Sequence, residues 1–349
     1  MFLNGCRMPL LPKNNNKGLV IPYKSLHSSF PFQMRWLDPL IKVAIFGLLL
    51  AGVYYQLSQN QNVDDIGRFL RAQKQLVVLF GVLAVTGLMI INWLIETFKW
   101  QQLLQPVVSL PRKQAVKGVL LGVTVSLFTP NRIGEYGGRM WVVPKGKRAE
   151  SVVATIIGSI ARWIVNIGIG GIGAAILLFV YSGIAREGIW FLMLASVVLL
   201  SILIALFSNL YWLEHLFDHF RMLRKYKHYL YFVRKYSVRQ LVGVVALSLL
   251  RYSVYCLQLI ALVAVFGIKI EYLTSAAIVN TLFFFQTLVP SIALMELGIR
   301  GNLALYLFSF FTTNAIAVLS ATFALWGINL LLPALAGYCL LLHTRITKS

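Results

Sequence analysis

The sequence has few charged residues and very few acidic ones, and these shortages exclude an ordinary soluble domain. Only 12% of the 349 residues are charged, whereas 58% are hydrophobic. A soluble chain of this length would carry about 25% charged residues, and one soluble core could not bury so much apolar surface. The composition therefore predicts a polytopic membrane protein whose solvent is lipid.

Patterns for metal ligands and disulfides are also missing. The three cysteines, Cys6, Cys256 and Cys339, lie far apart and form no CxxC pair. His215 and His219 have i, i+4 spacing, but the glutamate of a zinc-protease helix is absent between them. No ATP-binding motif is present either. The sequence thus predicts no metal site and no cofactor.

Long apolar runs divide the chain into helical spans, because a helix needs about 20 apolar residues to cross a bilayer. The runs that are long enough are Asp38–Leu57, Leu76–Thr97, Glu150–Tyr181, Glu187–Ser208, Leu241–Gly267 and Asn314–His343. Two shorter runs, Ala115–Thr129 and Thr274–Val289, each end at a proline and are followed by a polar turn and a second apolar arm. That pattern is typical of re-entrant helical hairpins. The predicted fold is an all-α polytopic membrane protein with six full transmembrane helices and two re-entrant hairpins.

The basic residues predict the orientation of these spans. The net charge is +21, and 22 Lys and Arg residues fall in the segments 1–37, 98–114, 130–149, 210–240 and 344–349. The segments on the opposite side hold six. Because basic loops stay on the cytoplasmic side, both termini are predicted to be cytoplasmic and the protein to lie in the plasma (inner) membrane.

The same reading predicts the domain organisation. Residues 1–37 are expected to form a disordered tail, in which Met34 is an alternative start, and 344–349 a short cytoplasmic tail. Residues 38–343 form one transmembrane domain. The loop 210–240 interleaves bases with aromatic residues, which favours a helix on the cytoplasmic leaflet that contacts anionic phospholipid rather than nucleic acid.

The two hairpin turns resemble each other. Each has a proline, then a glutamate, then an arginine four residues after the glutamate: Pro130, Glu135 and Arg139, and Pro290, Glu296 and Arg300. The halves 38–181 and 187–343 each contain two spans, a hairpin and a third span. Since three crossings is an odd number, the second half is inverted relative to the first, as in many secondary transporters.

Ionisable side chains inside the membrane are costly, and they usually mark a functional site. Glu135 and Arg139 share a helix face, as do Glu296 and Arg300. Arg162 lies near the middle of its span without an acidic partner there, so Glu135, Glu296 or a lipid phosphate is its expected partner. The candidate lipid-binding residues are Arg132, Glu135, Arg139, Arg162, Glu296 and Arg300. Ordinary structural ion pairs are the alternative interpretation.

The turns themselves have a predicted structural role. The residues expected to shape them are Pro130, Asn131, Gly134, Pro290, Ser291 and Gly298. The half-helices after the prolines, near Ile133 and Leu294, would offer unpaired N–H groups to an anion.

Other polar positions are expected to be structural. Glu96 and Lys99 are predicted to end the second span at the interface, and Arg251 to extend to the cytoplasmic edge. The stretch Gly168–Gly173 predicts close helix packing.

Together, the first turn, Arg162 and the second turn resemble the lysylphosphatidylglycerol synthetase transmembrane region, a flippase-like membrane family. The resemblance covers roughly residues 38–343. The family motif is close to Pro-Gly-Arg-hydrophobic-Gly-Glu, and this chain has Asn131 in place of the first glycine. In the second turn Ser291 and Ile292 stand where a glycine pair is usual. Because the chain stops at Ser349, the resemblance implies a stand-alone flippase-like protein without the soluble synthetase domain.

Three hypotheses follow. The first is a translocator that binds a phospholipid or lipid-linked headgroup in a polar cavity between the hairpins. The second is a membrane enzyme of lipid or lipid-linked sugar metabolism, which would need paired carboxylates such as Glu135 and Glu296. The third is a scaffold that does not transport. Membrane lipids, above all anionic phospholipid, are the expected partners. A second copy of the chain and a lipid-modifying enzyme are further candidate partners.

Overall fold

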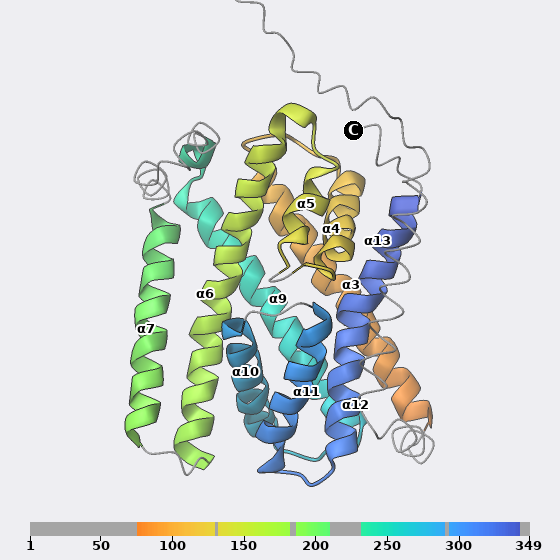
Figure 1. Ribbon diagram of the computed structural model, residues 1–349, viewed down its shortest axis with the longest axis vertical. Helices are drawn as coiled ribbons and strands as arrows, with labels where there is room; N and C mark the ends of the chain where they lie inside the picture. Colours follow the sequence, from red (N-terminus) through yellow and green to blue (C-terminus); the bar gives the residue numbers. More distant parts are fainter. Residues whose placement is uncertain (1–74, 130–131, 182–185, 210–231, 290–292, 343–349) are drawn as a thin grey trace, which may run out of the picture.

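The computed structural model describes residues 75–129, 132–181, 186–209, 232–289 and 293–342. Within these ranges every regular element is a helix and no strand occurs (Figure 1). The predicted first span, 38–57, lies outside the described residues. So do both predicted tails and most of the predicted surface helix, 210–231.

Five helical segments are long and apolar enough to cross a membrane among the described residues. They are α3 (Gln75–Leu104), α6 (Arg148–Tyr181), α7 (Arg186–Ser208), α9 (Val238–Val265) and the continuous pair α12 (Ala315–Trp326) and α13 (Leu332–Leu342). They confirm the predicted spans in this part of the chain. The predicted end of the second span at Thr97 is wrong, however, because α3 continues to Leu104.

A π-helical turn, η3 (Gly327–Leu331), joins α12 to α13. Pro333 follows it, and proline has no N–H to donate to the carbonyl four residues earlier, that of Asn329. The indole Nε1 of Trp93 on α3 donates to this carbonyl at 3.2 Å. The break in the last span is therefore satisfied by a neighbouring helix, as buried backbone requires.

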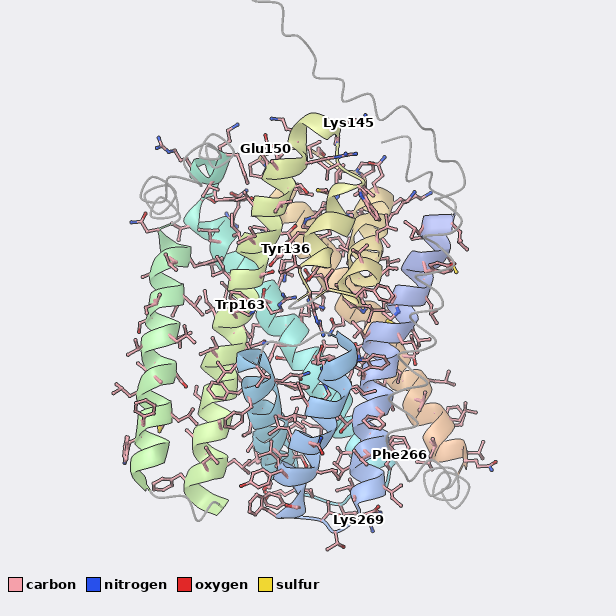
Figure 2. All side chains as sticks on the ribbon, in the orientation of Figure 1. Tyr136, Lys145, Glu150, Trp163, Phe266 and Lys269 are labelled. Carbon is pink, nitrogen blue, oxygen red and sulfur yellow. The ribbon has the colours of Figure 1, made fainter. Side chains whose placement is uncertain are left out.

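Two pairs of shorter helices occupy opposite halves of the molecule. The first pair is α4 (Arg112–Ser126) and α5 (Gly134–Met140), and the second is α10 (Tyr272–Leu288) and α11 (Ala293–Ser309). In Figure 1 the first pair lies in the upper half and the second in the lower half. Lys145, just after α5, is at the top in Figure 2, and Lys269, just before α10, is at the bottom.

Each pair packs against the last span of the other half. Helix α4 packs on α13, and α10 packs on α6. A Cβ added to Gly337 of α13 would lie 2.3 Å from the carbonyl oxygen of Leu120 in α4. A Cβ added to Gly173 of α6 would lie 2.4 Å from Cβ of Asn280 in α10. Glycine therefore permits close approach at both contacts, which confirms the packing role predicted for the α6 glycines.

Helices α3 and α9 also pack against each other. Before α9 the chain is fixed to α3, because the buried hydroxyl of Tyr236 donates a hydrogen bond to the Leu103 carbonyl. Burial raises the pKa of this hydroxyl, so it stays protonated as a donor. Ser237 then caps α9 through a capping box with Gln240.

Candidate functional site

A cavity of about 560 Å³ lies where the two helix pairs meet. Its wall includes residues of α3, α6, α9, α10, α11 and η3 and of the turn before α5. Charged side chains from both halves of the chain line it: Lys99, Arg132, Arg162, Arg251, Glu296 and Arg300. Glu96 and Glu135 form ion pairs with members of this set, and Arg139 pairs with both of these carboxylates. We call these nine residues the charged centre.

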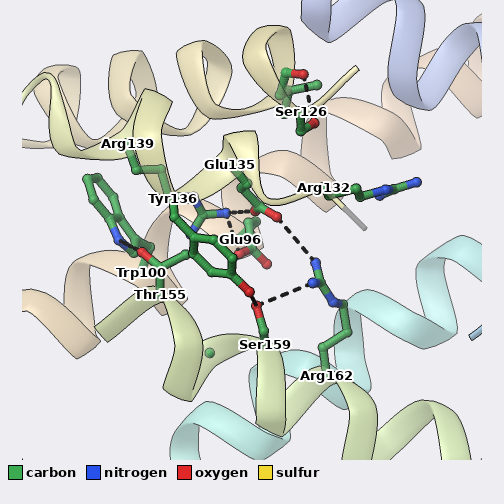
Figure 3. A network of polar contacts seen from close by, with 12 residues as sticks. Glu96, Trp100, Ser126, Arg132, Glu135, Tyr136, Arg139, Thr155, Ser159 and Arg162 are labelled. Carbon is green, nitrogen blue, oxygen red and sulfur yellow. Dashed lines mark hydrogen bonds and ion pairs between the residues drawn. The ribbon is translucent and has the colours of Figure 1, made fainter. Parts of the chain in front are cut away.

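The first hairpin contributes Glu135 and Arg139 from one face of α5 (Figure 3). Arg139 forms an ion pair with Glu135 one turn earlier and a second with Glu96 of α3, where the N–O distance is 2.8 Å. The side chain of Arg139 is 2% exposed, and its guanidinium carbon lies 5.5 Å from the centre of the Trp100 ring. Arg139 is therefore a buried structural cation with two carboxylate partners.

The second hairpin repeats this arrangement. Arg300 forms an ion pair with Glu296 one turn earlier on α11, with an N–O distance of 2.7 Å. Arg300 also donates a hydrogen bond to the hydroxyl of Tyr255 on α9, at 2.8 Å. Glu296 also accepts hydrogen bonds from Gln286 and, across the interface between the halves, from Arg132 at 3.0 Å. The two hairpins are thus joined by an ion pair at the cavity.

Among the cations of the charged centre, Arg162 has the longest ion-pair distance to a carboxylate. Its nearest carboxylate oxygen belongs to Glu135, at 3.7 Å, and its guanidinium donates to the Ser159 hydroxyl at 3.3 Å. Figure 3 shows Arg162 reaching from α6 toward Glu135, with Tyr136 beside Ser159. The structure thus confirms Glu135 as its protein partner. The Arg162 side chain remains 25% exposed in the cavity wall.

Three residues that we expected at the interface are instead part of the charged centre. Glu96 and Lys99 are buried, and their side chains pair at 2.7 Å. Arg251 does not extend to the membrane edge. It binds Glu96 at 2.6 Å and the Asn92 side chain at 2.7 Å. The prediction failed because α3 does not end at Thr97, so Glu96 and Lys99 lie inside a longer helix.

The sequence did contain a signal for these residues. Asn92, Glu96 and Lys99 follow one another at intervals of four and three residues within an apolar run. Such spacing places all three on one helix face. A polar face on a membrane helix points toward protein or a water-filled cavity. Their partners, Arg139 and Arg251, are too distant in sequence to be inferred that way.

The predicted turn residues have mixed outcomes. Pro130, Asn131, Pro290 and Ser291 lie outside the described residues. Gly134 and Gly298 are wrong as turn residues, because both lie in helices, at the start of α5 and inside α11.

Gly134 serves close packing instead. A Cβ there would lie 2.5 Å from the Val125 carbonyl of α4. In the described part of the first turn, the residue in the left-handed region is Arg132, with φ 58°. Such a conformation is unusual for a residue with a Cβ.

The start of α5 does not present free N–H groups to an anion. The N–H of Gly134 donates to the Thr129 hydroxyl at 2.7 Å. Those of Glu135 and Tyr136 donate to carbonyls of the preceding turn. The prediction of a backbone anion site near Ile133 is therefore wrong, and side chains supply the positive charge here. Residues just before α11 are outside the described ranges, so the site near Leu294 stays a prediction.

One part of the cavity wall is apolar and exposed. Ile133, Trp163 and Val289 line the cavity and also present large exposed side chains on the surface of the described residues. They come from the first turn, α6 and the end of α10. The charged interior is therefore continuous with an apolar rim.

These features define a multi-pass membrane protein with a buried, predominantly cationic centre between two short helical hairpins. The chain belongs to the family of the lysylphosphatidylglycerol synthase transmembrane region, whose model matches residues 40–341. The match is to the transmembrane region alone. No curated protein matches the chain.

Proposed function

We propose that this protein is a flippase-like translocator, which binds the anionic headgroup of a membrane lipid in the charged centre. The observation that carries the proposal is the cavity itself. Its guanidinium groups come from both hairpins, from α6 and from α9, and they surround a space of about 560 Å³. Cavities of this size hold small-molecule ligands. Guanidinium is well suited to phosphate because its planar fork of donors matches two phosphate oxygens.

The arrangement of the halves supports alternating access. The hairpins lie in opposite halves, and each packs on the last span of the other half. We interpret this as an inverted-topology repeat with two re-entrant hairpins, in which substrate binds near the midplane. Arg132 and Glu296 join the hairpins directly. Separation of this pair on one side would open the cavity, and movement would be downhill or coupled to an ion.

The apolar rim supports a lipid as the substrate. Ile133, Trp163 and Val289 would contact the tails while the headgroup lies among the cations. A lipid could then move with its tails in the hydrocarbon, so that only the polar headgroup needs the protein. On this proposal the protein lies in the plasma (inner) membrane with both termini in the cytoplasm.

The carboxylates favour binding over acid–base chemistry. Glu96, Glu135 and Glu296 each contact two or more cations. Carboxylates held in this way are stabilised as anions and are poor proton donors. Among the carboxylates of the charged centre, the geometry therefore offers the membrane-enzyme hypothesis no free catalytic pair.

The decisive experiment replaces Arg162 with alanine. Because Arg162 has only a 3.7 Å carboxylate contact and one hydroxyl contact, the protein should remain folded. Movement of fluorescent anionic phospholipid across liposomes should fall by about tenfold or more, as expected for loss of a charge-assisted phosphate contact. Folding is checked by gel filtration and thermal unfolding in detergent.

The matched control is Lys147→Ala, which removes an exposed cation near the start of α6. It should leave lipid movement unchanged. Equal movement by wild type, the Arg162 variant and protein-free liposomes would refute translocation. The charged centre would then be a structural feature of a protein that does not transport.

A further inference from the structure

The charged centre is not electrically balanced. Among the described residues it contains six cations and three carboxylates, Glu96, Glu135 and Glu296. Each carboxylate is already shared between cations, so three positive charges remain uncompensated within the described part of the chain. A buried charge is costly unless it is paired. The site therefore favours a ligand that brings several negative charges.

We infer that the substrate headgroup is polyanionic, a lipid phosphomonoester or diphosphate, rather than a zwitterionic or aminoacylated phospholipid. This inference rests on the proposed function and specifies its substrate class. A phosphomonoester carries roughly −1.5 to −2 at neutral pH, which approaches the excess of the site. A zwitterionic headgroup brings no net negative charge, and an aminoacylated phosphatidylglycerol is net neutral, or net positive when the aminoacyl group is lysyl.

The cations divide into two groups by exposure. The side chains of Lys99, Arg139 and Arg300 are almost fully buried and hold the carboxylates. Those of Arg132 and Arg162 are 31% and 25% exposed, and both line the cavity. Arg251 is intermediate and lines the cavity as well. Arg132 from the first turn, Arg162 from α6 and Arg251 from α9 are therefore the cations that a ligand in the cavity can contact.

Arg300 also lines the cavity, but its side chain is only 2% exposed and its Nε is fully buried. Arg300 therefore belongs with the structural cations, and Arg132, Arg162 and Arg251 are the cations that a ligand in the cavity would contact.

The test is a headgroup series measured by calorimetry on the purified full-length protein in detergent. The probes are dioctanoyl phosphatidic acid, farnesyl diphosphate, dioctanoyl phosphatidylcholine and inorganic pyrophosphate. We expect both polyanionic lipids to bind about tenfold or more tightly than phosphatidylcholine, since each charge-assisted hydrogen bond contributes strongly. Pyrophosphate should bind more weakly than farnesyl diphosphate, because it lacks an apolar chain for the rim.

Arg162→Gln should lower the affinity for both polyanionic lipids by about tenfold and leave the affinity for phosphatidylcholine unchanged. Arg132→Gln serves as a second variant in case the first one unfolds. Lys147→Gln and Lys269→Gln remove exposed cations that do not line the cavity, and neither should change any of these affinities.

The outcomes separate this inference from the proposed function. Equal affinity for phosphatidylcholine and farnesyl diphosphate would overturn the polyanionic substrate, whereas translocation measured in liposomes would still stand. Equal affinity for pyrophosphate and farnesyl diphosphate would support a polyanion site but overturn a lipid as its ligand. Unchanged affinities in both cavity variants would overturn the placement of the ligand in the charged centre.

Discussion

The carboxylate of Glu96 has more charged partners than any single hairpin residue has. Its two oxygens contact Lys99, Arg139 and Arg251, which come from three different helices. In a low-dielectric interior one carboxylate can therefore hold three helices together, provided that it stays ionised. Glu96 therefore connects the cations of the site, and it lies inside α3 rather than at the end of the span.

Replacing Glu96 with glutamine should destabilise the protein strongly. The variant keeps the shape of the side chain but leaves buried cations without a counter-charge, which typically costs about 3–5 kcal/mol. The free energy of unfolding in mixed micelles measures the loss. Glu150→Gln is the control, since Glu150 pairs with an exposed lysine and should cost about 1 kcal/mol or less. A similar loss for both variants would contradict this role of Glu96.

At the scale of elements, the contacts α4–α13 and α6–α10 are equivalent. In each, a hairpin arm lies against a glycine of the last span in the opposite half. Association of membrane helices depends on such close packing, because lipid removes the hydrophobic driving force. Each hairpin is thus held by its first arm against a span of the other half, while the Arg132–Glu296 ion pair joins the two hairpins at the cavity.

Gly337→Ala and Gly173→Ala should each destabilise the protein by about 1–3 kcal/mol, as overpacking does. The added Cβ would meet backbone at Gly337 and a side-chain Cβ at Gly173, and neither can move aside easily. The control is Gly87→Ala in α3, where no atom lies within 4 Å of the new Cβ. It should be neutral or slightly stabilising, since alanine favours helix over glycine. Thermal unfolding in detergent compares the variants, and an equal effect at Gly87 would contradict this account.

At the scale of the whole molecule, the proposed inverted repeat requires the two halves to run in opposite directions. Lys147 follows the first hairpin and Lys269 precedes the second, and both side chains are exposed. The neighbouring Lys145 and Lys269 appear at opposite ends of the molecule in Figure 2. We expect the first end to be cytoplasmic, because the basic residues of the sequence concentrate in the segments on that side.

Cysteine labelling tests this topology. With Cys6, Cys256 and Cys339 changed to serine, Lys147→Cys should react with an impermeant maleimide only from the cytoplasmic side. Lys269→Cys should react only from the outer side, because the bilayer separates the two positions. Both should react after the membrane is dissolved in detergent, which controls for accessibility. Labelling of both from one side of intact membranes would contradict the inverted repeat.

Local sequence patterns were enough to predict the spans that the structure describes and the approximate position of both short helix pairs. Hydropathy acts over neighbouring residues, and prolines break a helix where they stand. The i, i+4 pairs Glu135–Arg139 and Glu296–Arg300 were predictable for the same reason, since each pair lies within one helix. The pairing of Arg162 with Glu135 was among the alternatives that the scarcity of acids left open.

The full set of residues in the charged centre depends on how separate helices pack and could not be predicted from local patterns. The approach of α3, α5 and α9 brings Glu96 to Arg139 and Arg251, although these residues are 43 and 155 positions apart in the chain. No local pattern encodes such a distance, because it results from the packing of separate helices. The excess of positive charge that selects the proposed ligand is likewise a property of the assembled cavity rather than of any one segment.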